Sequence, residues 1–131
     1  MRRLRSDSGA VAVEFALVLL PLVLIVMGII DFGSAYGSQL SLSSAARDGA
    51  RVMALSGTRA AATTATTAAA AGLSQAPTIV ITVNGSATAS CSAGATVTVK
   101  ATYPLTSLTG MFSSLMAGEK LTGVGVMRCG G

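Results

Sequence analysis

The amino-acid sequence predicts an α+β fold, in which a long N-terminal helix and a second, Ala/Thr-rich helix pack with a small antiparallel β-sheet. Three observations support this prediction: an apolar run near the N-terminus, a helical apolar pattern beyond it, and alternating β-branched residues in the last third. The chain divides into four predicted parts. These are a leader at 1–9, a transmembrane segment at 10–30, a continuation of the helix outside the membrane at 31–55 and a small β-rich domain at 56–131.

The apolar run has the length and composition of a membrane-spanning helix. Residues 15–30 carry no charge, and 51% of the 131 residues are hydrophobic. Together with the residues from Ala10 onward, the run measures roughly 31 Å as a helix, against a hydrocarbon core of about 30 Å. Basic residues precede the run and Asp31 follows it. The positive-inside rule therefore predicts a cytoplasmic N-terminus and an extracytoplasmic C-terminus. The basic residues are Arg2, Arg3 and Arg5.

A cleaved secretory signal peptide is the alternative interpretation of the same run. Gly33-Ser34-Ala35 supplies a small-x-small cleavage site after an apolar region. The run is long for a signal peptide, however, and it carries Glu14 near its start and Asp31 just before the proposed cut. These features favour a retained anchor.

Glu14 is the one charged residue in the predicted transmembrane segment. A carboxylate at the centre of a bilayer costs roughly 2.5–3.5 kcal/mol on insertion scales, so an intramembrane acid is a functional candidate by default. The alternative is a carboxylate that simply reaches the headgroup zone.

Beyond the membrane, apolar residues fall within one helical arc that we expect to cover the core of the domain. They are Phe32, Ala35, Tyr36, Leu42, Ala46, Ala50 and Met53. Small residues also recur at every fourth position of this segment, which lets helix backbones approach closely. They are Gly33, Gly37, Ser41, Ala45 and Gly49. The ridge packs either against another subunit or against this protein's own domain, unless it merely reflects an Ala/Gly/Ser-rich composition.

Turn signals and β-branched residues organise the rest of the chain. Ser56-Gly57 ends the long helix, and the Ala/Thr tract at 58–72 predicts a second helix, with a flexible spacer as the alternative. Strands are predicted at 78–83, 96–103 and 121–129, and a weaker returning strand at 87–91 after the Asn84-Gly85 turn. A loop or short helix is expected at 106–118.

Cys91 and Cys129 both fall in the predicted extracytoplasmic part. In an oxidising compartment we expect them to form one disulfide, which by chain entropy contributes roughly 3–4 kcal/mol to the free energy of unfolding. Two separate buried thiols are the alternative.

The composition argues against catalysis, metal binding and nucleic-acid binding. There is no histidine to serve as a base or to complete a zinc site, and the acids are widely spaced. Gly123-Val124-Gly125 lacks the lysine and following helix of a phosphate loop. The net charge of +4 comes from scattered basic residues without stacking aromatic side chains between them. We expect no enzyme activity, no cofactor and no nucleic-acid partner.

Three short motifs in residues 5–55 resemble the TadE-like minor pilins (pseudopilins) of the tight-adherence (Tad, Flp) pilus, a type IV pilus system. The motifs are Gly9-Ala10-Val11-Ala12-Val13-Glu14-Phe15-Ala16-Leu17, Ile29-Ile30-Asp31-Phe32-Gly33 and Ala45-Ala46-Arg47-Asp48-Gly49-Ala50-Arg51. Phe15 stands where the much shorter major Flp pilins typically carry tyrosine, which favours a minor subunit. The rest of the chain resembles this family only in forming a small β-rich domain.

The resemblance implies a role for each residue of the first motif. A prepilin peptidase would cut between Gly9 and Ala10, and Glu14, followed by Phe15, would take part in subunit assembly by pairing with the new amino group of Ala10. The implied protein sits in the bacterial inner membrane, contacts other pilin subunits, the Tad assembly platform and lipid, and then joins a pilus for adherence. A membrane-anchored or secreted small binding domain unrelated to pili is the alternative.

Overall fold

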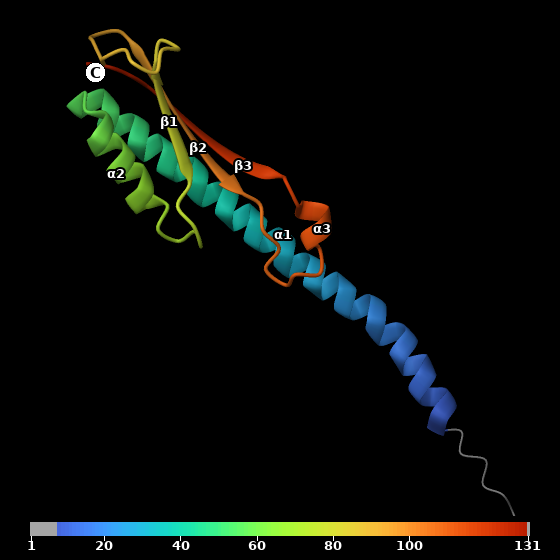
Figure 1. The fold of residues 1–131 in the computed structure, drawn as a ribbon. Helices are drawn as coiled ribbons and strands as arrows, with labels where there is room; N and C mark the ends of the chain where they lie inside the picture. Colours follow the sequence, from blue (N-terminus) through green and yellow to red (C-terminus); the bar gives the residue numbers. More distant parts are fainter. Residues whose placement is uncertain (1–7, 131) are drawn as a thin grey trace, which may run out of the picture.

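The computed structural model describes residues 8–130 and has the α+β fold that the sequence predicts (Figure 1). The predicted leader at 1–9 lies mostly outside the described residues. The elements in chain order are α1 (Ser8–Ser56), α2 (Arg59–Ala69), β1 (Thr78–Val83), β2 (Thr96–Pro104), α3 (Ser113–Met116) and β3 (Lys120–Arg128).

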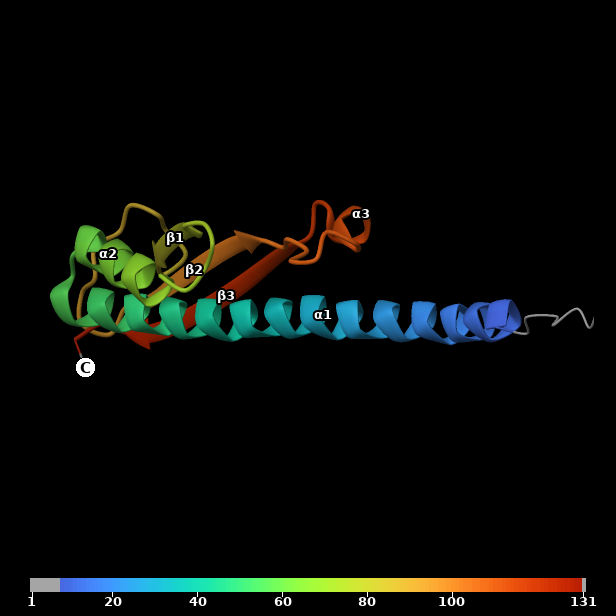
Figure 2. The same cartoon turned by 90° about the horizontal axis from the view of Figure 1, so that it is seen from below.

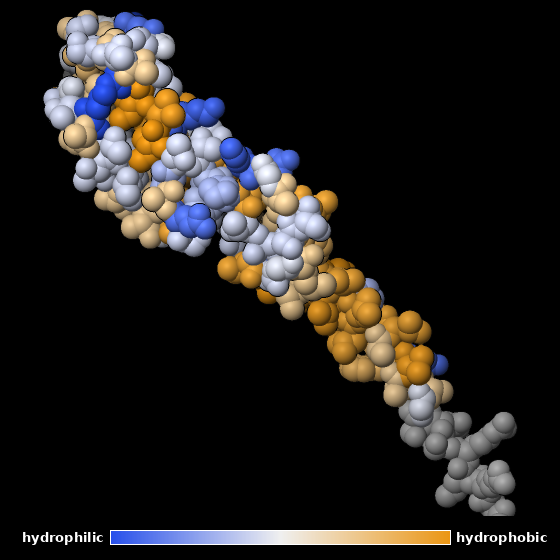
Figure 3. Space-filling view, in the orientation of Figure 1, coloured by the Kyte–Doolittle hydropathy of each residue, from blue (hydrophilic) through white to orange (hydrophobic). Residues whose placement is uncertain are grey.

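Helix α1 is one continuous helix of 49 residues that runs through Pro21. Its N-terminal end projects beyond the rest of the molecule, while its second half carries α2 and the sheet along its side (Figures 1 and 2). Among the described residues, α1 is the one helix long and apolar enough to cross a membrane, and its most apolar stretch has no buried residue. On the face drawn in the space-filling view, this stretch is predominantly apolar (Figure 3).

The sheet is antiparallel, with β2 in the centre of the order β1-β2-β3. Its inner face rests on α1 and alternates as predicted: Val97, Val99, Ala101 and Tyr103 of β2 are all buried. Across the sheet, Ile81 of β1 pairs with Val99, and Val99 pairs with Gly125 of β3.

Two glycines let β3 lie directly on the backbone of α1. A Cβ built at Gly123 would collide with the Leu42 carbonyl group, and one at Gly125 with the Ala46 carbonyl group. Glycine inside a strand is otherwise unfavourable, so close backbone approach explains both positions. Gly123 and Gly125, whose spacing resembles a fragment of a phosphate loop, are therefore part of the helix–sheet interface.

Helix α2 packs on another face of α1 through an equally close contact. A Cβ at Gly49 would collide with the Thr66 hydroxyl of α2, and both residues are buried. The Ala/Thr tract thus forms the predicted helix, and the spacer alternative is wrong.

The returning strand predicted at 87–91 does not form. Asn84 and Gly85 adopt the positive φ of a tight turn, and Val83 bridges Ser86, but the chain then leaves the sheet. The place beside β1 that a hairpin partner would take belongs to β2, whose β-branched alternation pairs along the whole length of β1.

Two members of the apolar arc on α1 are also placed differently from the prediction. Phe32 and Tyr36 are 64% and 68% exposed, whereas Leu42 and Met53 are buried. The sheet covers only the distal part of α1. At the level of Phe32, the neighbouring loop packs on the face that carries Gly28 and Asp31 instead.

We predict that Gly125→Ala destabilises the fold by about 1–3 kcal/mol, the usual range for forced overpacking. The added methyl group has no room between β3 and the backbone of α1. Thermal unfolding of the full chain in detergent micelles, followed by circular dichroism, measures the change. Gly37→Ala is the matched control, because Gly37 faces open space and alanine is favoured in helices by about 1 kcal/mol. Equal unfolding temperatures for both variants would contradict the interface.

Candidate functional site

The predicted processing and assembly residues lie together on the first turns of α1. Gly9, Ala10, Glu14 and Phe15 are all exposed. Ala10 and Glu14 are four residues apart, so both lie on one face of the helix. An amino group created at Ala10 would therefore start within one helical turn of the Glu14 carboxylate.

The helix around these residues presents an apolar surface that is unsuited to water. Most large apolar side chains in this half of α1 are exposed, including Leu17 at 71% and Val18 at 68%. Monomeric soluble proteins rarely expose contiguous apolar surface on this scale, which marks an interface with protein or membrane. The surface needs a bilayer or neighbouring helices to cover it.

The small-residue ridge divides into two parts. Ala45 and Gly49 are buried, with Gly49 against α2 of the same chain, and Ser41 is half-buried. Gly33 and Gly37 are exposed with open space around them. The distal part of the ridge thus serves the protein's own fold, while Gly33 and Gly37 are not covered by other described residues of this chain.

Exposed apolar side chains flank the free glycines. Phe32, Tyr36 and Leu40 are each more than half exposed. Together with Gly33 and Gly37 they form a stripe that continues the apolar surface of the N-terminal half. We call these five residues the α1 stripe.

Asp31 anchors a distant loop to α1, a role that the sequence analysis did not assign. The residue is 1% exposed. The Ser107 and Thr109 hydroxyls donate to Oδ2 at 2.7 and 2.8 Å, and the Leu108 and Thr109 N–H groups donate to Oδ1 at 2.9 Å. Its position directly after the apolar run was the available signal, but its partners lie 76 to 78 residues away.

The four hydrogen bonds also set the protonation state of Asp31. Burial by itself would raise the pKa of this carboxyl, but the donors from Ser107, Thr109 and Leu108 together hold it below the ordinary value of 3.8. The anchor is therefore ionised at neutral pH, which strengthens each hydrogen bond.

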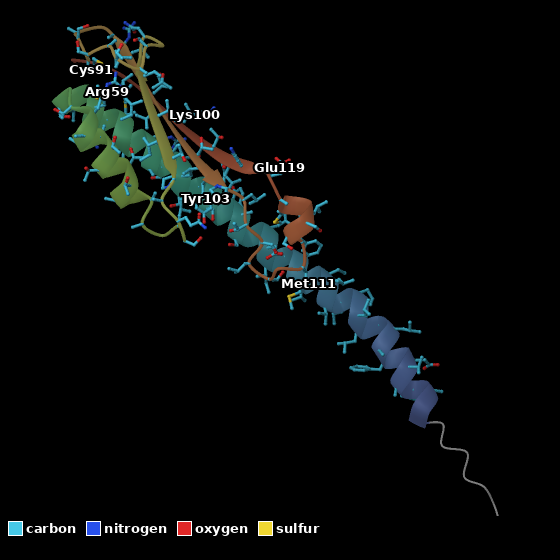
Figure 4. The ribbon with its side chains drawn as sticks, in the orientation of Figure 1. Arg59, Cys91, Lys100, Tyr103, Met111 and Glu119 are labelled. Atoms are coloured by element: carbon cyan, nitrogen blue, oxygen red, sulfur yellow. A yellow bond between two sulfur atoms is a disulfide. The ribbon has the colours of Figure 1, made fainter. Side chains whose placement is uncertain are left out.

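The distal end of the domain is held by a disulfide and an arginine. Cys91 and Cys129 form the predicted disulfide, with their Cα atoms 5.6 Å apart. The Arg59 guanidinium donates to the Ile81 and Ala89 carbonyl oxygens, both at 2.6 Å. Arg59 and Cys91 lie at the same end of the molecule (Figure 4), so the 84–95 connection is fastened to α2 and to the end of β3.

A hollow of about 260 Å³ between α1 and the loops is lined by Ser34, Ser38, Ser74 and Tyr103 among others, and by no acid, base or thiol. Within residues 8–130, no three His, Cys, Asp or Glu side chains are grouped as a metal site would require.

Comparison with known proteins bears out the resemblance seen in the sequence. Residues 9–51 match the family model described as TadE-like protein. The matched segment begins at the predicted cleavage site and contains Glu14, Asp31 and the whole ridge. No curated protein and no solved structure matches the chain.

We predict that Asp31→Ala releases the loop at 107–109 while the sheet stays folded. Hydrogen-exchange protection of the Leu108 and Thr109 amides should fall to the level of exposed loop amides, because both lose their acceptor. In the unchanged protein, the folded-state pKa lies below 3.8, so the anchor is complete above that value and is lost as pH falls through the lower folded-state pKa. Asp48→Ala, at an exposed aspartate of α1, is the control. Unchanged protection in Asp31→Ala would refute the anchor.

Proposed function

We propose that this chain, TadE-like over residues 9–51, is a minor pilin that takes part in assembly of a Tad-type pilus for adherence. The protein is made with its N-terminus in the cytoplasm, spans the inner membrane through the first half of α1, and presents its domain outside. A prepilin peptidase removes the leader after Gly9. The observation that carries this proposal is the uncovered apolar half of α1, which bears a single carboxylate one turn from the cleavage site.

Cleavage provides a positively charged partner for the Glu14 carboxylate. Before processing, its carboxylate is the only charge in an apolar span and carries the insertion cost of a lone acid. Cleavage creates a positive amino group at Ala10, on the same face of the same helix or on a neighbouring subunit. Opposite charges that pair in a low-dielectric surrounding offset much of their desolvation, whereas a lone buried charge does not.

The α1 stripe supports contact with other pilus subunits. Gly33 and Gly37 allow a second helix to approach the backbone closely, and Phe32, Tyr36 and Leu40 would supply the buried area beside them. Nothing in this proposal requires a catalytic step, a cofactor or a metal.

The first prediction concerns processing. Intact mass and N-terminal sequencing of the protein from membranes of its native host should give a mature chain that starts at Ala10. A chain that starts at Tyr36 would instead indicate a secreted domain released by signal peptidase, and an uncut chain would indicate a plain membrane anchor. Either result would remove the pilin mechanism.

The second prediction concerns Glu14. Glu14→Ala removes the intramembrane charge, so membrane insertion should persist while incorporation into pili falls. Pili are sheared from cells, and the subunit is quantified in the sheared and membrane fractions. Glu119→Ala makes the same change at an exposed glutamate of the domain and should leave incorporation unchanged. Normal incorporation of Glu14→Ala would rule out the pairing role.

A further inference from the structure

Residues 105–118 of the connection between β2 and β3, which we call the loop, lie alongside the part of α1 that we propose to be in the membrane. We infer that this loop is a second membrane contact, which enters the headgroup and upper acyl-chain region of the leaflet on the domain side. The inference rests on the proposed membrane span of α1, and it is independent of processing and of pilus assembly.

The position of the loop relative to α1 carries the inference. The Phe112 ring reaches within 4.0 Å of the Cβ position of Gly28, and Met111 forms an apolar groove with α1 residues that include Leu20 and Leu24. At 1.5 Å per residue, Gly28 is about 4.5 Å and Leu24 about 10 Å nearer the N-terminal end of α1 than Asp31. Figure 2 shows α3 beside this level of α1, and Figure 4 shows Met111 next to the helix. If α1 spans the bilayer as proposed, the loop cannot stay wholly in water.

The composition of the loop suits lipid. Its fourteen residues from Leu105 to Gly118 include no charged side chain, and charge returns only with Glu119 and Lys120. Large apolar side chains point away from the domain, with Leu108 70%, Met111 52% and Leu115 74% exposed. Single exposed leucines are ordinary, but here three large apolar side chains lie within eight residues, beside an apolar helix.

Eight of the fourteen backbone N–H groups of residues 105–118 donate hydrogen bonds, which lowers the cost of placing irregular structure near lipid. Asp31 accepts two N–H groups and two hydroxyls from the near side of the loop. Further N–H groups donate to Ser107, Thr109 or carbonyl oxygens within the loop. The hydrogen-bonded N–H donors are those of Leu105, Leu108, Thr109, Gly110, Met111, Ser113, Leu115 and Met116.

Two features limit the depth to the interfacial region. Ser113 and Ser114 of α3 are exposed, and their hydroxyls suit headgroup depth rather than the bilayer centre. Asp31 is ionised and lies at the base of the loop. The exposed apolar side chains of the loop therefore enter the leaflet, while the Asp31 anchor stays near the headgroups.

Lipid is the occupant that the geometry favours over a second copy of the chain. The groove beside Met111 is walled in part by Val23 and Leu24, which lie inside the proposed span on the side nearer the domain. Whatever fills it must itself reside in the bilayer, and acyl chains surround every copy of the protein there. The apolar surface of the loop is continuous with the lipid-facing surface of α1.

Single-tryptophan variants test the inference directly, because the chain contains no tryptophan. Leu115→Trp reports on the loop, Val18→Trp on the span, and Leu55→Trp on the distal end of α1. All three leucine or valine side chains are more than two-thirds exposed, so the larger ring fits. Each full-length variant is reconstituted in phosphatidylcholine vesicles with plain or brominated acyl chains. We expect Leu115→Trp to show blue-shifted emission and strong quenching by lipid brominated near the headgroup, while Leu55→Trp emission stays unquenched and accessible to iodide.

The other possible outcomes distinguish a failure of the loop contact from a failure of the proposed membrane span. Quenching of Val18→Trp without quenching of Leu115→Trp, with Leu115→Trp open to iodide, would overturn the loop contact and leave the span intact. If Val18→Trp were also unquenched, both the span and the loop contact would fall. If Leu115→Trp were shielded from iodide only at high protein-to-lipid ratio and unquenched by brominated lipid, a second copy would be the occupant and the lipid contact would be wrong. Leu108→Trp repeats the test at a second exposed position of the loop.

Discussion

The direct contact between the backbones of α1 and β3 is the constraint on which the rest of the structure depends. The domain is small, and much of its buried core consists of alanine and valine, so few large side chains are available to fill space between layers. Gly123 and Gly125 close that space instead, by bringing the strand onto the helix. Dispersion contacts fall off steeply with distance, so a gap at this point would weaken the packing of every neighbour. The same contact aligns β3 lengthwise with α1.

That alignment links the two ends of the domain. At one end of β3, the Cys91–Cys129 disulfide and Arg59 fasten the 84–95 connection. At the other end, the chain turns into the 105–118 loop, which Asp31 ties to α1. The helix that carries the apolar, proposed membrane-spanning surface is thus also the platform on which the whole domain is built. The orientation of the domain relative to α1 is fixed by short-range contacts at both ends rather than by a flexible linker.

The regular elements of this fold could be predicted from local pattern alone, because helical and strand periodicity are properties of adjacent residues. Both helices and the three strands that form lie close to their predicted positions. The Asp31 anchor could not be predicted in this way, since the carboxylate and its donors belong to segments with no shared periodicity. Phe32 and Tyr36 were misassigned for a related reason: helical spacing indicates a face but not how far along the helix a domain extends. Glu14 could be singled out from the sequence as the one charge in the apolar run, whereas its proposed pairing depends on an amino group that exists only after cleavage.

The hydrogen bond from Gln39 Nε2 to the Thr122 carbonyl oxygen joins α1 to β3 across 83 residues of chain. During synthesis, the helix is therefore made long before the strand that covers its inner face. Contacts of such large sequence separation form late, because loop closure precedes any gain from them. Until β3 arrives, the buried face of α1 around Leu42 and Ala46 is open to solvent and to other chains. The chain consequently passes through an interval in which this face can bind other chains, and the length of the interval is set by the time needed to synthesise the segment between helix and strand.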